Sequence, residues 1–358
     1  MEQRAPLRVA LIGAGFISAQ HAPAWVATPD AQVVAICDVD IARATARRDQ
    51  FAALGQPGIA LFTSVEETFV SSPLDAVDIA TRPESHHALV QAAASRKLAV
   101  LCQKPLAPTF AEAAAIVDVC HLAGVRFMVN EMWRFLPWFR DLRRFLGDPE
   151  TGSGSLIGPA HYLRIIGPRR PMRRSLPVHE NQPYFAEMPR LIIYEMDIHW
   201  IDAARSLLGE VETVYARAGR VNPLIRGEDW AMLVLGHRGG ATSLLESSWA
   251  TPSDLPEPRR EGDVLVEGTE GALHFDPQAM ELRLIRPEGT SVVARYDDLA
   301  SSFQRAFDGC IGHFAAAVRH GQPFESSAED NLRTLSATFA AYDSLEWGTV
   351  SRLDEFSG

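Results

Sequence analysis

The chain has 358 residues, of which 47% are hydrophobic and 22% are charged, which is typical of a globular protein and excludes a disordered one. This length exceeds one ordinary hydrophobic core and predicts two domains. The net charge of −11 argues against a general nucleic-acid binder and against attachment to an acidic membrane surface.

The four cysteines form no CxxC pair, so reduced thiols are expected rather than disulfides or a zinc site. The histidines show no metal-ligand spacing, and we expect no metal. The N-terminus lacks the apolar core of a signal peptide, and no run of about 18 apolar residues occurs. A cytoplasmic protein with no membrane partner is therefore expected.

The first 130 residues alternate apolar runs with helical patterns, as a parallel sheet does. Strands are predicted at residues 7–12, 32–37, 60–63, 76–80, 99–102 and 127–129. Helices are predicted between them at residues 16–27, 41–54, 85–95 and 110–122. Six strands with crossover helices predict an α/β Rossmann domain, a doubly wound parallel sheet, over residues 1–130.

Beyond residue 130 strands dominate, after one helical pattern at 138–146. Strands are predicted at residues 161–166, 211–218, 230–236, 241–249, 264–267, 272–275, 281–285 and 291–296. Helices are predicted at residues 190–208, 303–319 and 328–346. This order predicts an α+β domain with a large, mostly antiparallel open sheet over residues 131–358. We expect it to shape the substrate site.

The first predicted strand runs into a glycine turn that has the form of a dinucleotide-binding fingerprint. Gly13 permits the tight turn, and Gly15 lets the backbone approach a pyrophosphate at the start of a helix. Phe16 and Ile17 follow at the start of the predicted helix, and Ser18 replaces the third glycine, whose role is close helix–strand packing. These residues are expected to contact the cofactor.

Asp38 ends the second strand at about the spacing expected of a ribose-binding acid. Its carboxylate would accept hydrogen bonds from the adenosine ribose and repel a 2′-phosphate, which favours NAD over NADP. In the alternative interpretation, Gly13 and Gly15 only make a turn and Asp38 caps the next helix.

Lys104 and Pro105 follow the fifth strand. The carboxyl ends of the strands form the ligand crevice of an open α/β sheet, so Lys104 is expected to point into the cofactor site. Taken alone, a lysine before a proline is more often a solvated loop residue.

The helix predicted over 190–208 carries Glu195, His199 and Asp202 at i, i+4 and i+7, which places them on one face. A carboxylate one turn from an imidazole can orient it and raise its basicity, as a general base requires. A structural ion pair on a surface helix is the alternative.

Taken together and in this order, the fingerprint, Asp38, Lys104-Pro105 and the Glu195–His199 helix resemble the Gfo/Idh/MocA family. Its members include glucose–fructose oxidoreductase and inositol dehydrogenase. The resemblance implies an N-terminal NAD-binding Rossmann domain and a C-terminal domain with an open sheet. It also implies assembly through that sheet, as a homodimer or homotetramer.

The chain departs from the family pattern at two positions. The usual Glu-Lys-Pro becomes Gln103-Lys104-Pro105, and the usual aspartate four residues before the histidine becomes Glu195. By the same resemblance, Thr81 and His86, which follow strand four, are expected cofactor contacts.

A narrower resemblance is to the branch of the family that oxidises D-apiose, a branched pentose, to a lactone with NAD. It is carried by residues 102–105, 181–184, 220–223 and 227–229. Gln182 and Tyr184 of the second segment are predicted to reach substrate hydroxyls. Trp133 and Arg134, which follow strand six, are further substrate-contact candidates, although the tryptophan would also suit a simple core position.

The resulting hypothesis is a sugar dehydrogenase that oxidises a carbinol carbon, most naturally the anomeric one. Lys104 would bond the reacting hydroxyl, His199 would accept its proton, and Glu195 would hold the imidazole. A lysine whose pKa is lowered by the positive ring of NAD could relay the proton instead. Two other functions remain open, a cyclitol dehydrogenase acting on a substrate such as inositol and a non-catalytic NAD-binding sensor or co-regulator.

Overall fold

The computed structural model describes residues 5–71, 73–148, 151–172, 175, 178–251 and 262–353. The chain divides into two compact units, and each is considered by itself. The first unit comprises residues 1–135 and 303–332, and the second comprises residues 136–302 and 333–358. The first unit therefore includes a late segment, residues 303–332, that the sequence prediction had assigned to the C-terminal domain.

The first unit contains a six-stranded parallel sheet of strand order β3-β2-β1-β4-β5-β6. Its strands are β1 (Leu7–Ile12), β2 (Ala31–Cys37), β3 (Ala60–Phe62), β4 (Ala76–Ile79), β5 (Ala99–Gln103) and β6 (Phe127–Asn130). The strand order reverses between β1 and β4, which is where such a sheet opens a crevice at its carboxyl edge. The Rossmann fold predicted from the sequence is confirmed.

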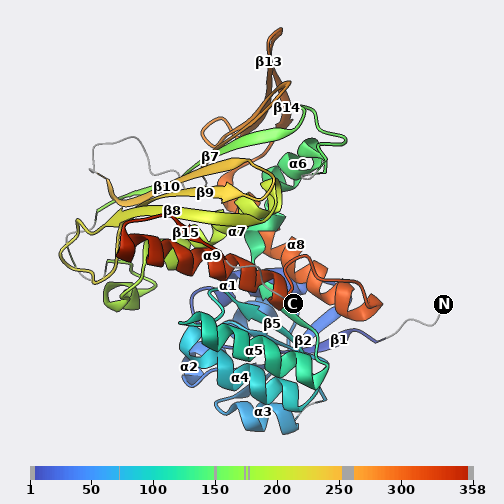
Figure 1. Cartoon of the computed structure of the whole chain (residues 1–358). Coiled ribbons are helices and arrows are strands. Elements are labelled where there is room, and N and C mark those ends of the chain that lie inside the picture. Colours follow the sequence, from blue (N-terminus) through green and yellow to red (C-terminus); the bar gives the residue numbers. More distant parts are fainter. Residues whose placement is uncertain are drawn as a thin grey trace. The chain divides into compact units, whose positions relative to one another are not determined.

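Helices connect these strands: α1 (Ser18–Val26), α2 (Ile41–Ala53), α3 (Val65–Ser71), α4 (Pro83–Ser95) and α5 (Phe110–Ala123). Helices α1 and α2 contact each other, and α3, α4 and α5 form a second group of neighbours (Figure 1). Local caps fix their ends, because the Thr109 hydroxyl accepts the Glu112 N–H at 3.2 Å and Gly124 ends α5 in the left-handed region. Helix α3 was not predicted.

The late segment of the first unit pairs with its sheet. Ser326 and Val129 exchange hydrogen bonds, with the Val129 N–H donating to the Ser326 carbonyl at 2.9 Å. Met128 forms an antiparallel bridge with Ser327. Phe314, from α8 (Leu299–His320), packs edge-on against Trp25 of α1. These contacts make residues 303–332 an integral part of this unit.

The second unit is built on a nine-stranded sheet of order β14-β13-β12-β11-β7-β10-β9-β8-β15. Its strands are β7 (Ala160–Pro171), β8 (Val211–Gly219), β9 (Trp230–His237), β10 (Thr242–Thr251), β11 (Asp263–Gly268), β12 (Gly271–Asp276), β13 (Glu281–Arg286), β14 (Gly289–Arg295) and β15 (Ser351–Arg352). All neighbours run antiparallel except β7 and β10, which run parallel. The predicted α+β architecture is confirmed, including the β9–β10 hairpin.

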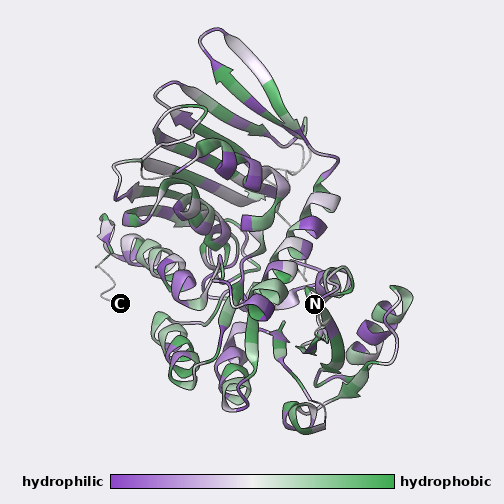
Figure 2. Cartoon of the chain, turned by 90° about the vertical axis from the view of Figure 1, so that its right-hand side faces the viewer, coloured by the Kyte–Doolittle hydropathy of each residue, from purple (hydrophilic) through white to green (hydrophobic). Residues whose placement is uncertain are grey.

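Buried and half-exposed residues alternate along the central strands, as in β9. The buried residues face the helical layer, in which α7 (Ile198–Leu208) contacts β7 and β10. Figure 2 shows hydrophobic and hydrophilic residues mixed along these strands. The other helical elements are η1 (Met132–Phe135) in the first unit, α6 (Pro137–Leu146), η2 (Pro183–Glu187) and η3 (Ile192–Asp197) in the second, and α9 (Ala328–Trp347).

Candidate active site

The glycine turn after β1 has the geometry that a dinucleotide needs. Gly13 has a φ of +95°, and a Cβ atom there would lie 2.7 Å from the Ala80 carbonyl oxygen and 2.8 Å from the Thr81 Cγ2. At Gly15 a Cβ would meet nothing within 4 Å, so the space beside its backbone is open. Ser18, in the third glycine position, is buried and donates its hydroxyl to the Gly15 carbonyl at 2.7 Å. The serine thus supports the turn from within.

The predicted helix start differs slightly, because α1 begins at Ser18 rather than at Phe16. Phe16 and Ile17 therefore lie in the turn, and the Phe16 side chain is 47% exposed. Arg47 of α2 donates to the Gly15 carbonyl at 2.9 Å and to the Ser18 hydroxyl at 2.9 Å. The turn is consequently held in place by side chains that leave its outer surface open.

Asp38 lies at the end of β2, next to the glycine turn. Its Oδ2 accepts the N–H of Ala14 at 2.7 Å, and its Oδ1 accepts the N–H of Asp40 at 2.9 Å. Each carboxylate oxygen has a second lone pair that remains suitable for a ribose hydroxyl. The open space at Gly15 and this fixed carboxylate fit a bound NAD, and Gly13, Gly15 and Asp38 are the residues that would hold it.

His86 and Thr81 lie together at the carboxyl end of β4. The His86 ring is fully buried, with Nδ1 2.9 Å from the Leu106 carbonyl and Nε2 3.1 Å from the Thr81 carbonyl. Burial lowers the pKa of this histidine, opposed by the two backbone hydrogen bonds. The ring thus joins the loop after β4 to the loop after β5, and this gives His86 a supporting position behind Thr81.

Lys104 follows β5 directly, is half-buried, and is joined to Pro105 by a cis peptide bond. Its charged neighbour is Glu131, a fully buried residue just after β6. Burial raises the pKa of Glu131 to about 7, while the charges of Lys104 and Arg134 oppose that rise. A carboxyl group that titrates near neutral pH beside the lysine can hold or release a proton there.

Glu131 lies at the carboxyl edge, one residue after the end of β6 at Asn130. From this position after strand six the sequence predicts that it faces the crevice, but no catalytic or binding role was predicted for it. Its electrostatic interaction with Lys104 places it beside the proposed catalytic lysine.

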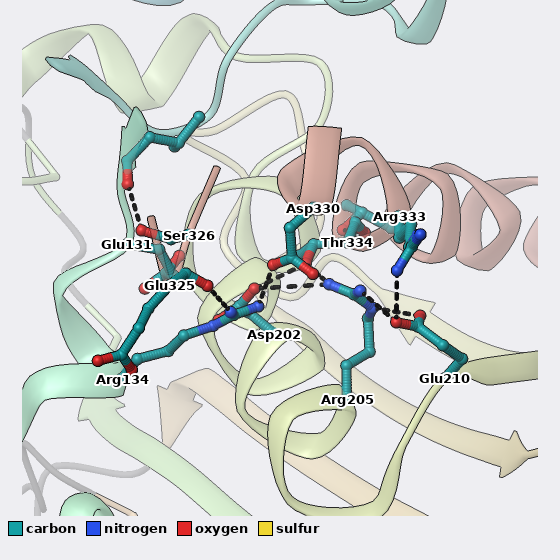
Figure 3. A network of polar contacts seen from close by, with 12 residues as sticks. Glu131, Arg134, Asp202, Arg205, Glu210, Glu325, Ser326, Asp330, Arg333 and Thr334 are labelled. Atoms are coloured by element: carbon teal, nitrogen blue, oxygen red, sulfur yellow. Dashed lines mark hydrogen bonds and ion pairs between the residues drawn. The ribbon is translucent and has the colours of Figure 1, made fainter. Parts of the chain in front are cut away.

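Trp133 and Arg134 follow in η1, and both are buried. The Arg134 guanidinium donates to the Glu325 carbonyl and forms an ion pair with Asp330 at 2.5 Å (Figure 3). The late segment of the first unit therefore engages this arginine. Its observed bonds are structural, and its predicted contact with substrate stays a prediction.

In the second unit, Glu195 and His199 lie on a helix that changes type between them. Residues 192–197 form a π-helix, η3, and an ordinary α-helix, α7, begins at Ile198. The single α-helix predicted over 190–208 is therefore wrong for its first part. Glu195 is half-buried and His199 is 5% exposed. Such π segments occur frequently at functional sites.

Asp197, also in η3, is a buried carboxylate that was not predicted as a site residue. It accepts a hydrogen bond from the Ser247 hydroxyl at 2.5 Å. Burial raises the pKa of Asp197 to about 7; the Ser247 bond opposes this, and the charge of Glu228 adds to it. The contact is non-local, because Ser247 belongs to β10, and no local pattern announces it.

Asp202 has a structural role within the second unit. Its Oδ1 accepts the Thr334 hydroxyl at 2.7 Å, and Arg205 donates to the same hydroxyl at 2.7 Å. Arg205 also bonds both carboxylate oxygens of Glu210, which Arg333 approaches at 3.2 Å (Figure 3). Asp202, which was expected to share one helix face with Glu195 and His199, hydrogen-bonds to Thr334 of α9 and so anchors α7 to that helix.

Gln182 directly precedes η2, and Tyr184 lies within it. The Gln182 side-chain amide donates to the Tyr184 hydroxyl at 2.9 Å. Tyr184 packs edge-on against the buried Phe185, which stacks on Trp249 at 5.7 Å between ring centroids. Both polar groups are thus held by a small apolar cluster, and their contact with substrate stays a prediction.

A hollow of about 430 Å³ lies on the second unit. Its lining includes the segments 217–220 and 226–228, with Arg217, Arg220 and Arg226 among them. The described residues that line it include none of the predicted catalytic residues. The hollow therefore lies at the loop between β8 and β9 and is not the predicted catalytic site.

The described part of the chain contains no group of three or more histidine, cysteine, aspartate and glutamate side chains arranged to hold a metal ion. None of its helices combines the length and apolar character needed to cross a membrane.

The comparisons with known proteins agree with this geometry. A family model described as "Oxidoreductase family, NAD-binding Rossmann fold" matches residues 7–131, and the GFO/IDH/MocA C-terminal domain matches residues 165–274. The chain is 34% identical over 345 residues to a D-apiose dehydrogenase from Rhizobium rhizogenes, covering 94% of this chain and 95% of that protein. It is 26% identical to an inositol 2-dehydrogenase from Rhizobium meliloti, covering 95% and 97%.

A solved structure is also similar over nearly its whole length. It is an oxidoreductase from Agrobacterium radiobacter in complex with NAD+, L-tartaric acid and magnesium. The TM-score is 0.86 and the identity 32%, with 97% of this chain and 98% of that chain covered. The fingerprint turn, the Lys104 strand end and the His199 helix thus occur in a chain whose two halves both match one family. The protein belongs to the Gfo/Idh/MocA family and is an NAD-dependent oxidoreductase.

Proposed function

We propose that the protein oxidises the anomeric hydroxyl of an aldose to the lactone with NAD, and that D-apiose is the first substrate to test. The observation that carries this proposal is the similarity to a D-apiose dehydrogenase at 34% identity over almost the whole of both chains. The segments 102–105, 181–184, 220–223 and 227–229 support it, because they resemble that branch of the family.

In the proposed reaction, bound NAD supplies the hydride acceptor. Lys104 donates a hydrogen bond to the oxygen of the reacting hydroxyl, and His199 accepts the hydroxyl proton. Glu195 orients the imidazole of His199. Glu131, next to Lys104, keeps the lysine positively charged or takes up a proton from it. The carbon thus loses a hydride and the oxygen a proton, which yields the lactone.

The direct test is the appearance of NADH fluorescence when purified protein and NAD are mixed with single sugars. The panel contains D-apiose, D-xylose, other aldopentoses and myo-inositol. Turnover of D-apiose with the highest kcat/KM supports the proposal. NAD binding without turnover of any member would contradict it and would favour the sensor function.

The roles of Lys104 and His199 are tested by Lys104→Met and His199→Gln. Each variant is expected to lower kcat by about 100-fold or more, because general acid–base groups contribute that much. The matched controls are Lys97→Met and His87→Gln, at exposed positions of the first unit. Near-normal turnover in either test variant would show that the role given to that residue is wrong.

A cyclitol dehydrogenase is the second candidate, because the chain is also similar to an inositol 2-dehydrogenase over nearly its full length. Myo-inositol in the same panel separates the two. A higher kcat/KM for myo-inositol than for every aldose would replace the first proposal with this one.

We also propose that the protein is a homodimer or homotetramer assembled through the nine-stranded sheet. The face of that sheet away from α7 carries half-exposed apolar side chains, among them Met232, Val234, Leu244 and Leu265. A cytoplasmic location is proposed with it, because the free cysteines Cys37, Cys102, Cys120 and Cys310 are all buried. Light scattering after size exclusion tests the assembly, and a monomeric mass would overturn it.

A further inference from the structure

Glu228 satisfies three consecutive backbone N–H groups at the start of the helix that carries His199. Its side-chain Oε1 accepts from Leu191 at 3.0 Å and from Ile193 at 3.1 Å. Its backbone carbonyl accepts from Ile192 at 3.2 Å. A helix leaves its first four N–H groups without intrahelical partners, so one residue here provides for three of them.

The hydroxyl of Tyr342, in α9, accepts the fourth of these N–H groups. The Tyr194 N–H donates to the Tyr342 hydroxyl at 3.1 Å, and that hydroxyl donates to the Glu228 Oε1 at 2.6 Å. The next amide, of Glu195, begins the helical ladder by donating to the Leu191 carbonyl at 2.8 Å. Glu228 and Tyr342 therefore provide acceptors for the N–H groups of residues 191–194, and the helix's own hydrogen bonds begin with the next N–H group.

The local sequence offers no substitute for this cap. The residue before η3 is Leu191, whose apolar side chain makes no cap bond of its own. The cap comes instead from a glutamate 37 positions away in the sequence. Loss of the cap would remove the acceptors of these N–H groups, and the first turn of the helix would then fray more easily.

The loop that presents Glu228 is itself fixed on both sides. Asp229 accepts the N–H groups of Val221 at 2.9 Å and Asn222 at 2.8 Å. At Gly227 a Cβ would lie 2.8 Å from the Leu191 Cβ, so only glycine allows this approach. These contacts of segment 227–229 thus hold the Glu228 carboxylate next to the start of η3.

The tyrosine is also held. The guanidinium carbon of Arg190 lies 5.0 Å from the centre of the Tyr342 ring and 5.3 Å from that of Phe339. A cation over the ring face stabilises its position. Both halves of the cap are therefore fixed by neighbours of their own.

We propose that Glu228 and Tyr342 are positioning residues, which fix the π-helical start of the His199 helix and so set the orientation of Glu195 and His199 for proton transfer. This inference rests on the proposed function for its kinetic part. Neither residue touches the reacting atoms in this proposal. They act by keeping the catalytic helix in one register, because small misplacements of catalytic groups lower the rate strongly.

The test compares Glu228→Ala, Glu228→Gln and Tyr342→Phe in the full-length protein. Glu228→Ala is expected to lower kcat by about 10- to 100-fold. The sugar KM should change by less than about threefold, because a positioning defect affects the transition state rather than ground-state binding. Glu228→Gln retains a side-chain oxygen acceptor and should restore most of kcat, and Tyr342→Phe should lower kcat less than Glu228→Ala does.

The matched controls are Tyr296→Phe and Asp141→Asn. The Tyr296 hydroxyl donates to the Asp141 carboxylate at 2.9 Å in the same unit, so the same kind of bond is removed at another place. These variants should keep the wild-type kcat. A wild-type kcat in Glu228→Ala, a change confined to KM, or a Glu228→Gln variant as slow as Glu228→Ala would each overturn the proposal.

Hydrogen exchange provides a readout that does not require turnover. The amides of residues 191–194 should exchange faster in Glu228→Ala and Tyr342→Phe than in the wild type and in both controls. If the wild type turns over no sugar, the proposed function fails, and the cap is then judged by exchange alone. Unchanged exchange in both variants would overturn it, whereas faster exchange would support it.

Discussion

His21 of α1 and Asp78 of β4 form a fully buried pair, with 2.7 Å between Nδ1 and Oδ2. Asp78 Oδ2 also accepts the indole N–H of Trp25 at 2.7 Å. The other ring nitrogen of His21 lies 2.8 Å from the side-chain nitrogen of Gln103. Gln103 is the residue before Lys104, so the pair connects the first helix of the fold to the strand end that carries the proposed catalytic lysine.

We expect Asp78→Ala to lower the free energy of unfolding by about 3–5 kcal/mol, because it leaves two buried donors without their acceptor. Urea unfolding measures this. Asp49→Ala is the control, since its ion pair with Arg48 is exposed and its loss should cost no more than about 1 kcal/mol. Equal losses of unfolding free energy in the two variants would show that the buried pair stabilises the fold no more than the exposed pair does.

Gly15→Ala should separate folding from cofactor binding. A Cβ there meets nothing within 4 Å in the protein, so the urea midpoint should stay within experimental error of the wild type. The added methyl would occupy the space where the pyrophosphate approaches, and NAD affinity should fall by about tenfold or more. Fluorescence titration with NADH gives the affinity.

The control for this glycine is Gly55→Ala. Gly55 also has open space around it, although its φ of +96° makes an alanine strained there. That variant should lose stability and keep its NAD affinity, the reverse of Gly15→Ala. Unaltered NAD binding in Gly15→Ala would place the pyrophosphate elsewhere.

Asp38→Ala should weaken the preference for NAD. The substitution removes the carboxylate that repels a 2′-phosphate, so the ratio of kcat/KM for NAD to that for NADP should fall by about tenfold or more. Asp40→Ala is the control, because Asp40 caps α2 by accepting the Ala42 N–H at 2.9 Å and otherwise forms an exposed ion pair with Arg43 at 3.5 Å. If the NAD-to-NADP ratio changes equally in both variants, Asp38 does not determine the preference for NAD.

The buried acids Glu131 and Asp197 make stability depend on pH. Burial raises both pKa values to about 7, from the ordinary values of 4.5 and 3.8. Between those ordinary values and 7, the unfolded chain releases protons that the folded chain keeps. The contribution of these two acids to stability is therefore greatest below the ordinary values, falls as the pH rises through this window, and levels off above 7.

Glu131→Gln should flatten part of this dependence. Each unit of pKa displacement corresponds to about 1.4 kcal/mol. The variant lacks the contribution that falls with pH, so its slope of unfolding free energy against pH should be less negative than that of the wild type. Unfolding by urea at several pH values between about 5 and 8 measures it. Glu66→Gln, at an exposed position of α3, should leave the slope unchanged. A difference in unfolding free energy between the wild type and Glu131→Gln that stays constant over this pH window would contradict the raised pKa of Glu131.

Features encoded by neighbouring residues could be predicted from the sequence. Gly13, Asp38 and Lys104 lie at strand ends, and the alternation of strands and helices was sufficient to locate them. The two sheets were predicted for the same reason, since the period of the apolar residues reports which face of an element is buried.

Features that depend on distant residues could not be predicted. Periodicity placed Asp202 on the face of His199, whereas its partner is Thr334, 132 positions away. The π-helical turn before His199 was missed because Glu228 and Tyr342, which cap it, lie in other elements. Glu131 and Asp197 look like ordinary acids in the sequence, because their burial follows only from the folded chain.

The exchange of hydrogen bonds between Val129 and Ser326 has a consequence for the biosynthesis of the protein. A nascent chain that ends before residue 314 leaves Trp25 without Phe314, and one that ends before residue 326 also leaves Val129 without its hydrogen bonds to Ser326. The cofactor-binding half therefore reaches its final packing only after nearly all of the polypeptide has left the ribosome. A gene fragment that stops at residue 130 would encode the whole fingerprint and yet yield an incompletely packed product.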